Sequence, residues 1–130
     1  MQPALNLSVL PDTYAVCRLK PESALPAWAT TGSFFSITRT DDELSVICLQ
    51  ANVPAGVQCE SDWSCFKIEG PLDFALTGIL VAAATPLAHV GISIFAIATY
   101  DTDYLMVRRE SLDRAIAALT RAGHKVTENV

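Results

Sequence analysis

The acidic and aromatic residues of the segment 97–107 carry side chains suited to the recognition of a small charged ligand. This segment, IATYDTDYLMV, holds Tyr100 and Asp103 between apolar residues. A carboxylate near an aromatic ring can accept an ammonium group in a charge-assisted hydrogen bond, which contributes about 1.5–3 kcal/mol. The tyrosine offers a flat wall and a hydroxyl, and the hydroxyl of Ser93 can donate and accept. These residue types favour binding of a ligand.

A helix start is the second feature that suits this chemistry. Gly78 opens the apolar stretch GILVAAATPLAHVG. We expect a helix from about Thr77 to Ala88, with Thr77 as the N-cap and Gly91 at the stop. The first N–H groups of a helix lack partners within it and attract a carboxylate, and a glycine leaves room for close approach. A helix start that faces an acidic turn therefore suits a ligand that carries both a carboxylate and an ammonium group.

Catalytic and metal-binding chemistry is not predicted. His89 and His124 have no ligand partners at the spacing of a metal site, and the four cysteines contain no C-x-x-C pair. No Cys–His or Ser–His pair has a recognisable spacing, and Asp103 is the one plausible general base. We therefore expect no enzyme activity, no metal and no cofactor.

The elements that would position the candidate residues are clearest in the second half of the chain. We expect a strand at 64–70, the helix described above, strands at 92–99 and 104–108 around an acidic turn, a helix capped by Ser111, and a last strand in HKVTE. This β-α-β-β-α-β order is the ferredoxin-like split βαβ motif, an antiparallel sheet with helices on one face.

The first half of the chain repeats part of this pattern. The segment ITRTDDELSVI, residues 37–47, matches residues 97–107 at a spacing of sixty, so that Thr40 corresponds to Tyr100 and Glu43 to Asp103. Both copies predict a strand, a tight acidic turn and a second strand. Two related units follow from this match, because only two copies fit.

The first unit has weaker elements than the second. TYAVCRL, SFFSITRT, LSVICL and VQCESDW are strand-like, whereas PESALPAWAT is broken by Pro26 and ANVPAG is too short for a full helix. We therefore predict an α+β chain of two ferredoxin-like βαββαβ units, the first one degraded. The expected boundaries are 1–63 and 64–130.

Composition narrows the classes of partner and the compartment. The chain has 130 residues, 51% of them hydrophobic, and a net charge of −5. It has no basic stripe for nucleic acid, and an acidic surface is repelled by anionic membranes. The first positive residue is Arg18, so the N-terminus lacks the charged region of a signal peptide. We expect a cytoplasmic protein with buried free thiols.

One uncharged stretch, residues 76–100, is long enough to span a bilayer. Polar residues occur throughout it, Pro86 and Gly91 interrupt it, and its composition changes from Ala/Leu-rich to β-branched. We interpret it as a buried helix followed by a buried strand rather than a membrane span.

The sequence GISIFAIATYDTDYLMV, which follows TGILVAAATPLAHV, resembles the ACT domain, a small βαββαβ ligand-binding module. The chain looks more narrowly like the paired ACT domains of the CASTOR arginine sensors and their small bacterial tandem-ACT relatives. The resemblance is strongest over residues 70–109, and FFSITRTDDELSVIC gives a fair match in the first half. It implies two ACT units that bind a free amino acid at an interface between paired domains and catalyse nothing themselves.

The resemblance also implies a ligand site in the second unit. Its residues lie at the start of the first helix, on the I-S-x-F strand and at the hairpin turn: Leu76, Gly78, Ile79, Ser93, Ile94, Thr99, Tyr100 and Asp103. Leu76 departs from the CASTOR pattern, which has an acid there. An arginine side chain would lose an anionic partner at that position, so a neutral or different amino acid remains open.

Three classes of function remain at this point. The first is an amino-acid-binding regulatory module that forms a twofold homodimer, because an apolar strand such as ISIFAIA is hazardous when exposed. The second is a ligand-free adaptor that uses the same fold for protein contacts. The third, an enzyme, lacks a recognisable catalytic pair.

Overall fold

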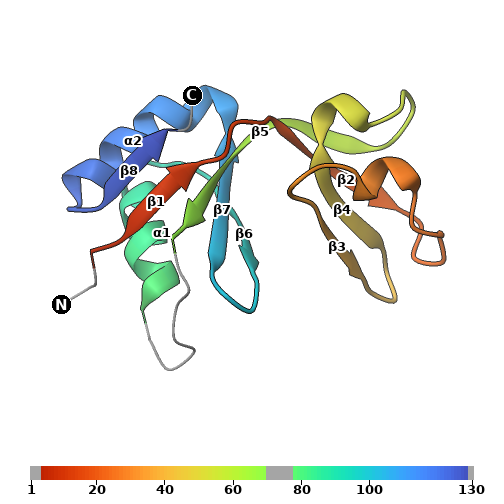
Figure 1. The fold of residues 1–130 in the computed structure, drawn as a ribbon, viewed down its shortest axis with the longest axis horizontal. Helices are drawn as coiled ribbons and strands as arrows, with labels where there is room; N and C mark the ends of the chain where they lie inside the picture. Colours follow the sequence, from red (N-terminus) through yellow and green to blue (C-terminus); the bar gives the residue numbers. More distant parts are fainter. Residues whose placement is uncertain (1–3, 70–77, 129–130) are drawn as a thin grey trace. The chain divides into compact units, whose positions relative to one another are not determined.

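The computed structural model of the chain describes residues 4–69 and 78–128 (Figure 1). The chain divides into two compact units. The smaller unit comprises residues 12–63, and the larger unit comprises residues 4–11 together with the described residues from 64 onward. Residues 4–11 therefore belong with the second half of the chain, although the predicted boundaries placed them in the first unit.

The larger unit is an antiparallel-dominated sheet with two α-helices. Its strands lie in the order β6-β7-β5-β1-β8. The elements are β1 (Asn6–Val9), the second half of β5 (Cys59–Ile68), α1 (Ile79–His89), β6 (Phe95–Ala98), β7 (Asp103–Arg108), a 3-10 turn η3 (Arg109–Ser111), α2 (Leu112–Arg121) and β8 (Lys125–Glu128). Without β1, this is the predicted ferredoxin-like order, β-α-β-β-α-β.

Strand β1 was not predicted, and it lies between the first and last strands of the ferredoxin-like motif. Leu7 pairs antiparallel with Ile68 of β5 and parallel with Val126 of β8. Four residues are too few for their alternation to predict a strand, and both partners of β1 are more than fifty residues away in the sequence.

The core of the larger unit lies between the helices and one face of the sheet. Strand side chains alternate between faces, so Leu5, Leu7 and Val9 share a face. They pack with Phe66 and Ile68 of β5, with Leu105 and Val107 of β7, and with both helices: Ala82, Ala83, Leu87, Ala115, Ala118 and Leu119. Among the described residues, no helix is long or apolar enough to cross a membrane.

Both helices end in the same hydrogen-bonded turn, the Schellman motif. After α1, the N–H of Gly91 bonds to the carbonyl of Ala88, and the N–H of Ile92 bonds to Leu87. After α2, Gly123 and His124 bond in the same way to Thr120 and Leu119. The predicted stop at Gly91 is confirmed, whereas the N-cap position of α1 is Gly78 and Thr77 lies outside the described residues.

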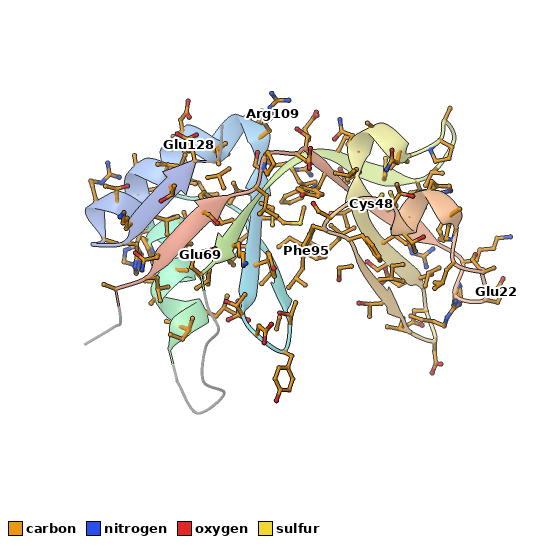
Figure 2. The ribbon with its side chains drawn as sticks, in the orientation of Figure 1. Glu22, Cys48, Glu69, Phe95, Arg109 and Glu128 are labelled. Carbon is orange, nitrogen blue, oxygen red and sulfur yellow. The ribbon has the colours of Figure 1, made fainter. Side chains whose placement is uncertain are left out.

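The smaller unit has a sheet in the order β3-β4-β2-β5. Its elements are β2 (Tyr14–Leu19), η1 (Ala27–Thr30), β3 (Ser36–Arg39), β4 (Leu44–Leu49), η2 (Gln50–Asn52) and the first half of β5. The 3-10 turn η1 stands where the larger unit has α1, whereas η2 corresponds to η3 and no helix follows it before β5. The core contains Ala29 of η1, Cys17 of β2 and Cys48 of β4, which is labelled in Figure 2.

Strand β5 is one continuous element, where we had predicted two strands. Its pairing with β2 shifts by one residue between Tyr14 and Val16, which marks a β-bulge. Asp62 adopts a positive φ of 64° at this bulge. The side chain of Gln50 supports it, accepting from the Asp62 N–H at 2.6 Å and donating to the Asp62 carboxylate at 3.0 Å.

The hairpins of the two units match at a spacing of fifty-nine residues, one fewer than predicted. Ser36 pairs with Ile47 across β3–β4, and Phe95 pairs with Met106 across β6–β7. The 3-10 turns η2 and η3 keep the same spacing. Because side chains alternate along a strand, an error of one residue assigns every side chain to the wrong face.

The corrected spacing changes which turn residues correspond. Thr40 matches Thr99, and each threonine N–H donates across its turn, to the carbonyl of Glu43 at 2.9 Å and of Thr102 at 2.8 Å. Each threonine hydroxyl also accepts a backbone N–H of its own turn. Asp103 is therefore the first residue of β7 and not a turn residue equivalent to Glu43.

Candidate functional site

The start of α1 presents backbone N–H groups beside a glycine. Gly78 has φ = 77° and ψ = 6°, and its carbonyl accepts the first helical hydrogen bond from Ala82 at 2.8 Å. Among the described residues, no side chain caps this end. A methyl group placed on Gly78 would meet none of the described residues within 4 Å. Backbone N–H groups at a helix start of this kind can donate hydrogen bonds to a ligand.

Three of the predicted site residues lie on the helix-covered side of the sheet. Ile79 and Ile94 are half-buried and pack against the core of the larger unit. Asp103 is half-buried at the start of β7, and alternation along that strand puts it on the same face as Leu105 and Val107. The side chains of Leu105 and Val107 belong to the core of the larger unit, against which Ile79 and Ile94 also pack. Asp103 and the first turn of α1 thus belong to one side of the sheet.

The β6–β7 turn holds its threonines in structural hydrogen bonds. The hydroxyl of Thr99 donates to the carbonyl of Thr102 at 2.9 Å. Thr102 is buried, and its hydroxyl donates to the carbonyl of Ile68 in β5. Thr102 was not among the predicted residues, because its partner is on a strand more than thirty residues earlier. The hydroxyl of Thr99 therefore stabilises the turn through hydrogen bonds to the backbone of Thr102.

The remaining predicted residues are exposed or undescribed. Tyr100 is 81% exposed at the tip of the turn, and Ser93 is exposed before β6. Leu76 lies outside the described residues. The structure thus brings Ile79, Ile94 and Asp103 to one side of the sheet, and it does not bury Tyr100 or Ser93.

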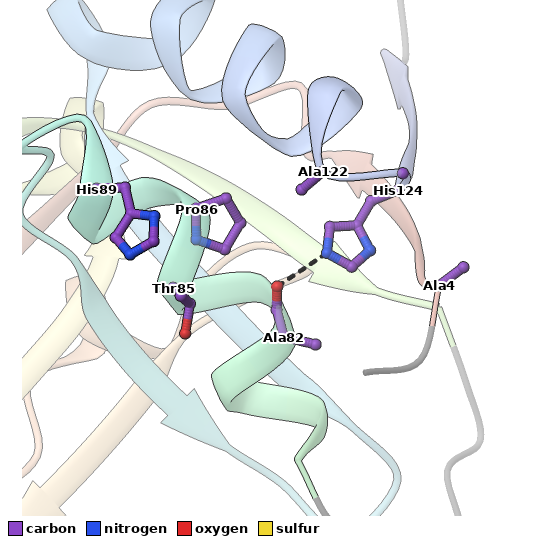
Figure 3. Close-up of a pocket in the computed structure, with 8 residues that line it drawn as sticks. Ala4, Ala82, Thr85, Pro86, His89, Ala122 and His124 are labelled. Atoms are coloured by element: carbon purple, nitrogen blue, oxygen red, sulfur yellow. Dashed lines mark hydrogen bonds between the residues drawn. The ribbon is translucent and has the colours of Figure 1, made fainter. Parts of the chain in front are cut away.

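A surface pocket of about 290 Å³ lies beside α1 (Figure 3). It is lined by residues from α1, from the end of α2 and from the start of the chain: Ala4, Ala82, Thr85, Pro86, His89, Ala122, Gly123 and His124. None of the predicted site residues that the structure describes lines this pocket. Over the described residues, no cluster of His, Cys, Asp or Glu is arranged to hold a metal ion.

His124 is buried at one wall of this pocket and joins three elements. Its Nδ1 accepts the N–H of Leu5 at 3.0 Å, so the ring hydrogen is on Nε2, which donates to the carbonyl of Ala82 at 2.8 Å (Figure 3). In a regular helix that carbonyl would accept the N–H of residue 86, but Pro86 has none. His124 supplies the hydrogen bond that Pro86 removes.

Two family models match the chain. The model of an N-terminal domain matches residues 12–56, and the model of the ACT domain matches residues 58–121. Residues 58–121 are thus an ACT domain. The ACT match covers β5 to α2, which is the part that contains Gly78 and Asp103.

Solved structures resemble this ACT-domain protein over nearly its whole length. The protein Atu0741 of Agobacterium tumefaciens is 43% identical, with a TM-score of 0.94, over 98% of this chain and 96% of that chain. A Vibrio cholerae protein described as a possible transport protein is 24% identical, with a TM-score of 0.74, over 92% of this chain and 91% of its own.

A third structure extends the likeness of the fold. The regulatory subunit of aspartate kinase from Thermus flavus is 13% identical, with a TM-score of 0.64, over 92% of this ACT-domain protein and 99% of the subunit. At that identity the likeness concerns the fold alone. Among curated proteins, no sequence matches the chain.

Proposed function

We propose that this chain is a regulatory module that binds a free amino acid at the start of α1 and has no catalytic activity of its own. The ligand carboxylate accepts hydrogen bonds from the N–H groups of Ile79 and Leu80, and its ammonium group pairs with the carboxylate of Asp103. The observation that carries the proposal is the positive φ of Gly78 at the N-terminus of α1 in an ACT domain, where a methyl group would meet none of the described residues.

The side chains around this position favour a neutral amino acid. Ile79 and Ile94 are apolar and half-buried, so they offer contact to an apolar side chain and no charge to a basic one. Leu76 stands where the arginine sensors have an acid, which supports the same preference. A regulatory subunit of aspartate kinase shares the fold, which supports a regulatory role rather than catalysis.

The proposal includes a homodimer in the cytoplasm. Helix α1 is apolar on nearly all sides, yet Leu80 is 39% and Val81 54% exposed. A helix of this kind is normally covered, and a second copy of the chain would cover it. The four cysteines are free thiols, as a reducing compartment maintains them.

Light scattering should give twice the chain mass, and a strict monomer with and without amino acids would contradict the dimer.

Thermal unfolding in the presence of each of the twenty amino acids tests the site. An amino acid at a hundred times its dissociation constant should stabilise the chain by about 2.7 kcal/mol. Asp103→Asn should remove most of this gain, because the neutral amide loses the charge-assisted bond to the ammonium group.

Asp101→Asn is the matched control, because Asp101 is an exposed aspartate two residues away. We expect it to keep the full ligand-dependent gain. Equal losses in the two variants would exclude Asp103 as the ammonium partner. If no amino acid changes the melting temperature of the wild-type chain, the proposed function fails and an adaptor role becomes the better hypothesis.

A further inference from the structure

The smaller unit has three cysteines on one face of its sheet. Cys17 lies on β2, Cys48 on β4 and Cys59 on β5. Cys17 and Cys48 are buried in the core of the unit, and Cys59 is half-buried against it. The proposed ligand site uses none of these cysteines, and all of them are free thiols.

The strand register puts Cys17 directly opposite Cys59. The neighbouring Arg18 N–H donates to the carbonyl of Gln58 at 2.9 Å, which makes 18 and 58 the hydrogen-bonded pair. Cys17 and Cys59 are then a non-hydrogen-bonded pair, in which the Cα atoms of an antiparallel ladder are about 4.5 Å apart. This separation falls within the range that a disulfide spans, about 4.4–6.8 Å.

We propose that Cys17 and Cys59 form a covalent modification site, a dithiol that a low-molecular-weight disulfide oxidises to an intramolecular disulfide. The Cys59 thiolate attacks one sulfur of the oxidant and releases the first small thiol. Cys17 then loses its proton to solvent, attacks the Cys59 sulfur and releases the second small thiol. Two protein thiols are oxidised and one small disulfide is reduced to two thiols.

The order of these two steps follows from burial. Burial, together with the neighbouring thiols of Cys48 and Cys59, raises the pKa of the Cys17 thiol to about 12. A buried thiol of this kind is a poor first nucleophile. Cys59 is the accessible member, and its sulfur lies 3.7 Å from the hydroxyl of Ser61. Cys59 therefore meets the oxidant first, and Cys17 closes the bond.

The other two cysteines are placed so that they stay reduced. Cys48 is opposite Ala15 in the register, not opposite a cysteine, and burial raises the pKa of its thiol. Cys65 lies in the larger unit and is fully buried, and burial raises its pKa to about 12. We therefore expect one disulfide per chain and two thiols that resist oxidation.

Oxidised glutathione, added to the folded full-length chain and followed by alkylation in denaturant, tests the proposal. Trypsin leaves Cys48, Cys59 and Cys65 in the single peptide 40–67, whereas Cys17 lies in a peptide that ends at Arg18. Mass spectrometry should find these two peptides joined. Variants then decide which cysteine is bonded: the cross-link should persist in Cys48→Ala and Cys65→Ala and be lost in Cys59→Ala.

Several outcomes would overturn the proposal. A cross-link that survives in Cys59→Ala, or that disappears in Cys48→Ala while that variant keeps a cooperative melting curve, would assign the bond to another pair. A glutathione adduct on Cys59 without a cross-link in the folded wild-type chain would show that Cys17 does not close the bond. The wild-type measurement needs no variant to fold.

Discussion

Replacing His124 by alanine is expected to lower the free energy of unfolding by about 3 kcal/mol. The substitution leaves two buried backbone groups without partners, the N–H of Leu5 and the carbonyl of Ala82, and each such group costs about 1–3 kcal/mol. Chemical denaturation of the two proteins measures the difference. His89→Ala is the control, because His89 is exposed on the same pocket, and it should change stability by less than about 0.5 kcal/mol.

A second variant tests whether His124 stabilises the chain by donating to the carbonyl that Pro86 leaves without a helical donor, or only by packing. In Pro86→Ala the backbone gains an N–H that can donate to the Ala82 carbonyl, as in a regular helix. The cost of His124→Ala should then fall by about 1 kcal/mol, and a double-mutant cycle measures this coupling. Strictly additive effects would show that His124 does not compensate for Pro86.

Replacing Gly78 by alanine is expected to abolish most of the ligand-dependent stabilisation. The added methyl group would meet none of the described residues within 4 Å and would lie at the start of α1, where the ligand carboxylate is proposed to approach the Ile79 N–H. The loss corresponds to about 2.7 kcal/mol at a ligand concentration a hundred times the dissociation constant. Thermal unfolding with and without the amino acid measures it.

Gly91→Ala is the matched control for Gly78→Ala. Gly91 follows the other end of α1 with φ = 75°, and a methyl group there would likewise meet no described residue within 4 Å. Both substitutions force an L-residue into the left-handed region and should each cost about 1 kcal/mol of stability. Only Gly78→Ala should lose the response to ligand. Loss in both variants would trace the effect to instability, and loss in neither would exclude the start of α1.

Much of the larger unit could be predicted from local sequence features. The apolar stretch after Gly78, the interruption at Gly91 and the acidic turn before β7 define α1, β6 and β7 within a few residues. The same features predict α2 with Ser111 at its N-cap position, although the Ser111 side chain makes no capping hydrogen bond to the described residues. These elements depend on neighbours in the sequence, which is why composition and spacing reveal them.

The features that were missed depend on contacts distant in sequence. Strand β1 exists because β5 and β8 flank it, and the role of Thr102 depends on a carbonyl of β5. The repeat was placed one residue out of register because acidic residues were aligned instead of the threonines that close each turn. The role of His124 could have been anticipated in part. A proline inside a predicted helix leaves the carbonyl one turn earlier without its helical donor, so another group must donate to it.

An NMR titration of the wild-type chain with each of the twenty amino acids tests the central claim most directly. We predict that the binding amino acid shifts the backbone amide signals of Ile79, Leu80 and Asp103 most strongly. Signals of Thr85 and Gly123, which line the separate pocket, should change little. Saturable changes centred on Thr85 and Gly123, with Ile79 and Asp103 unmoved, would contradict the proposed site.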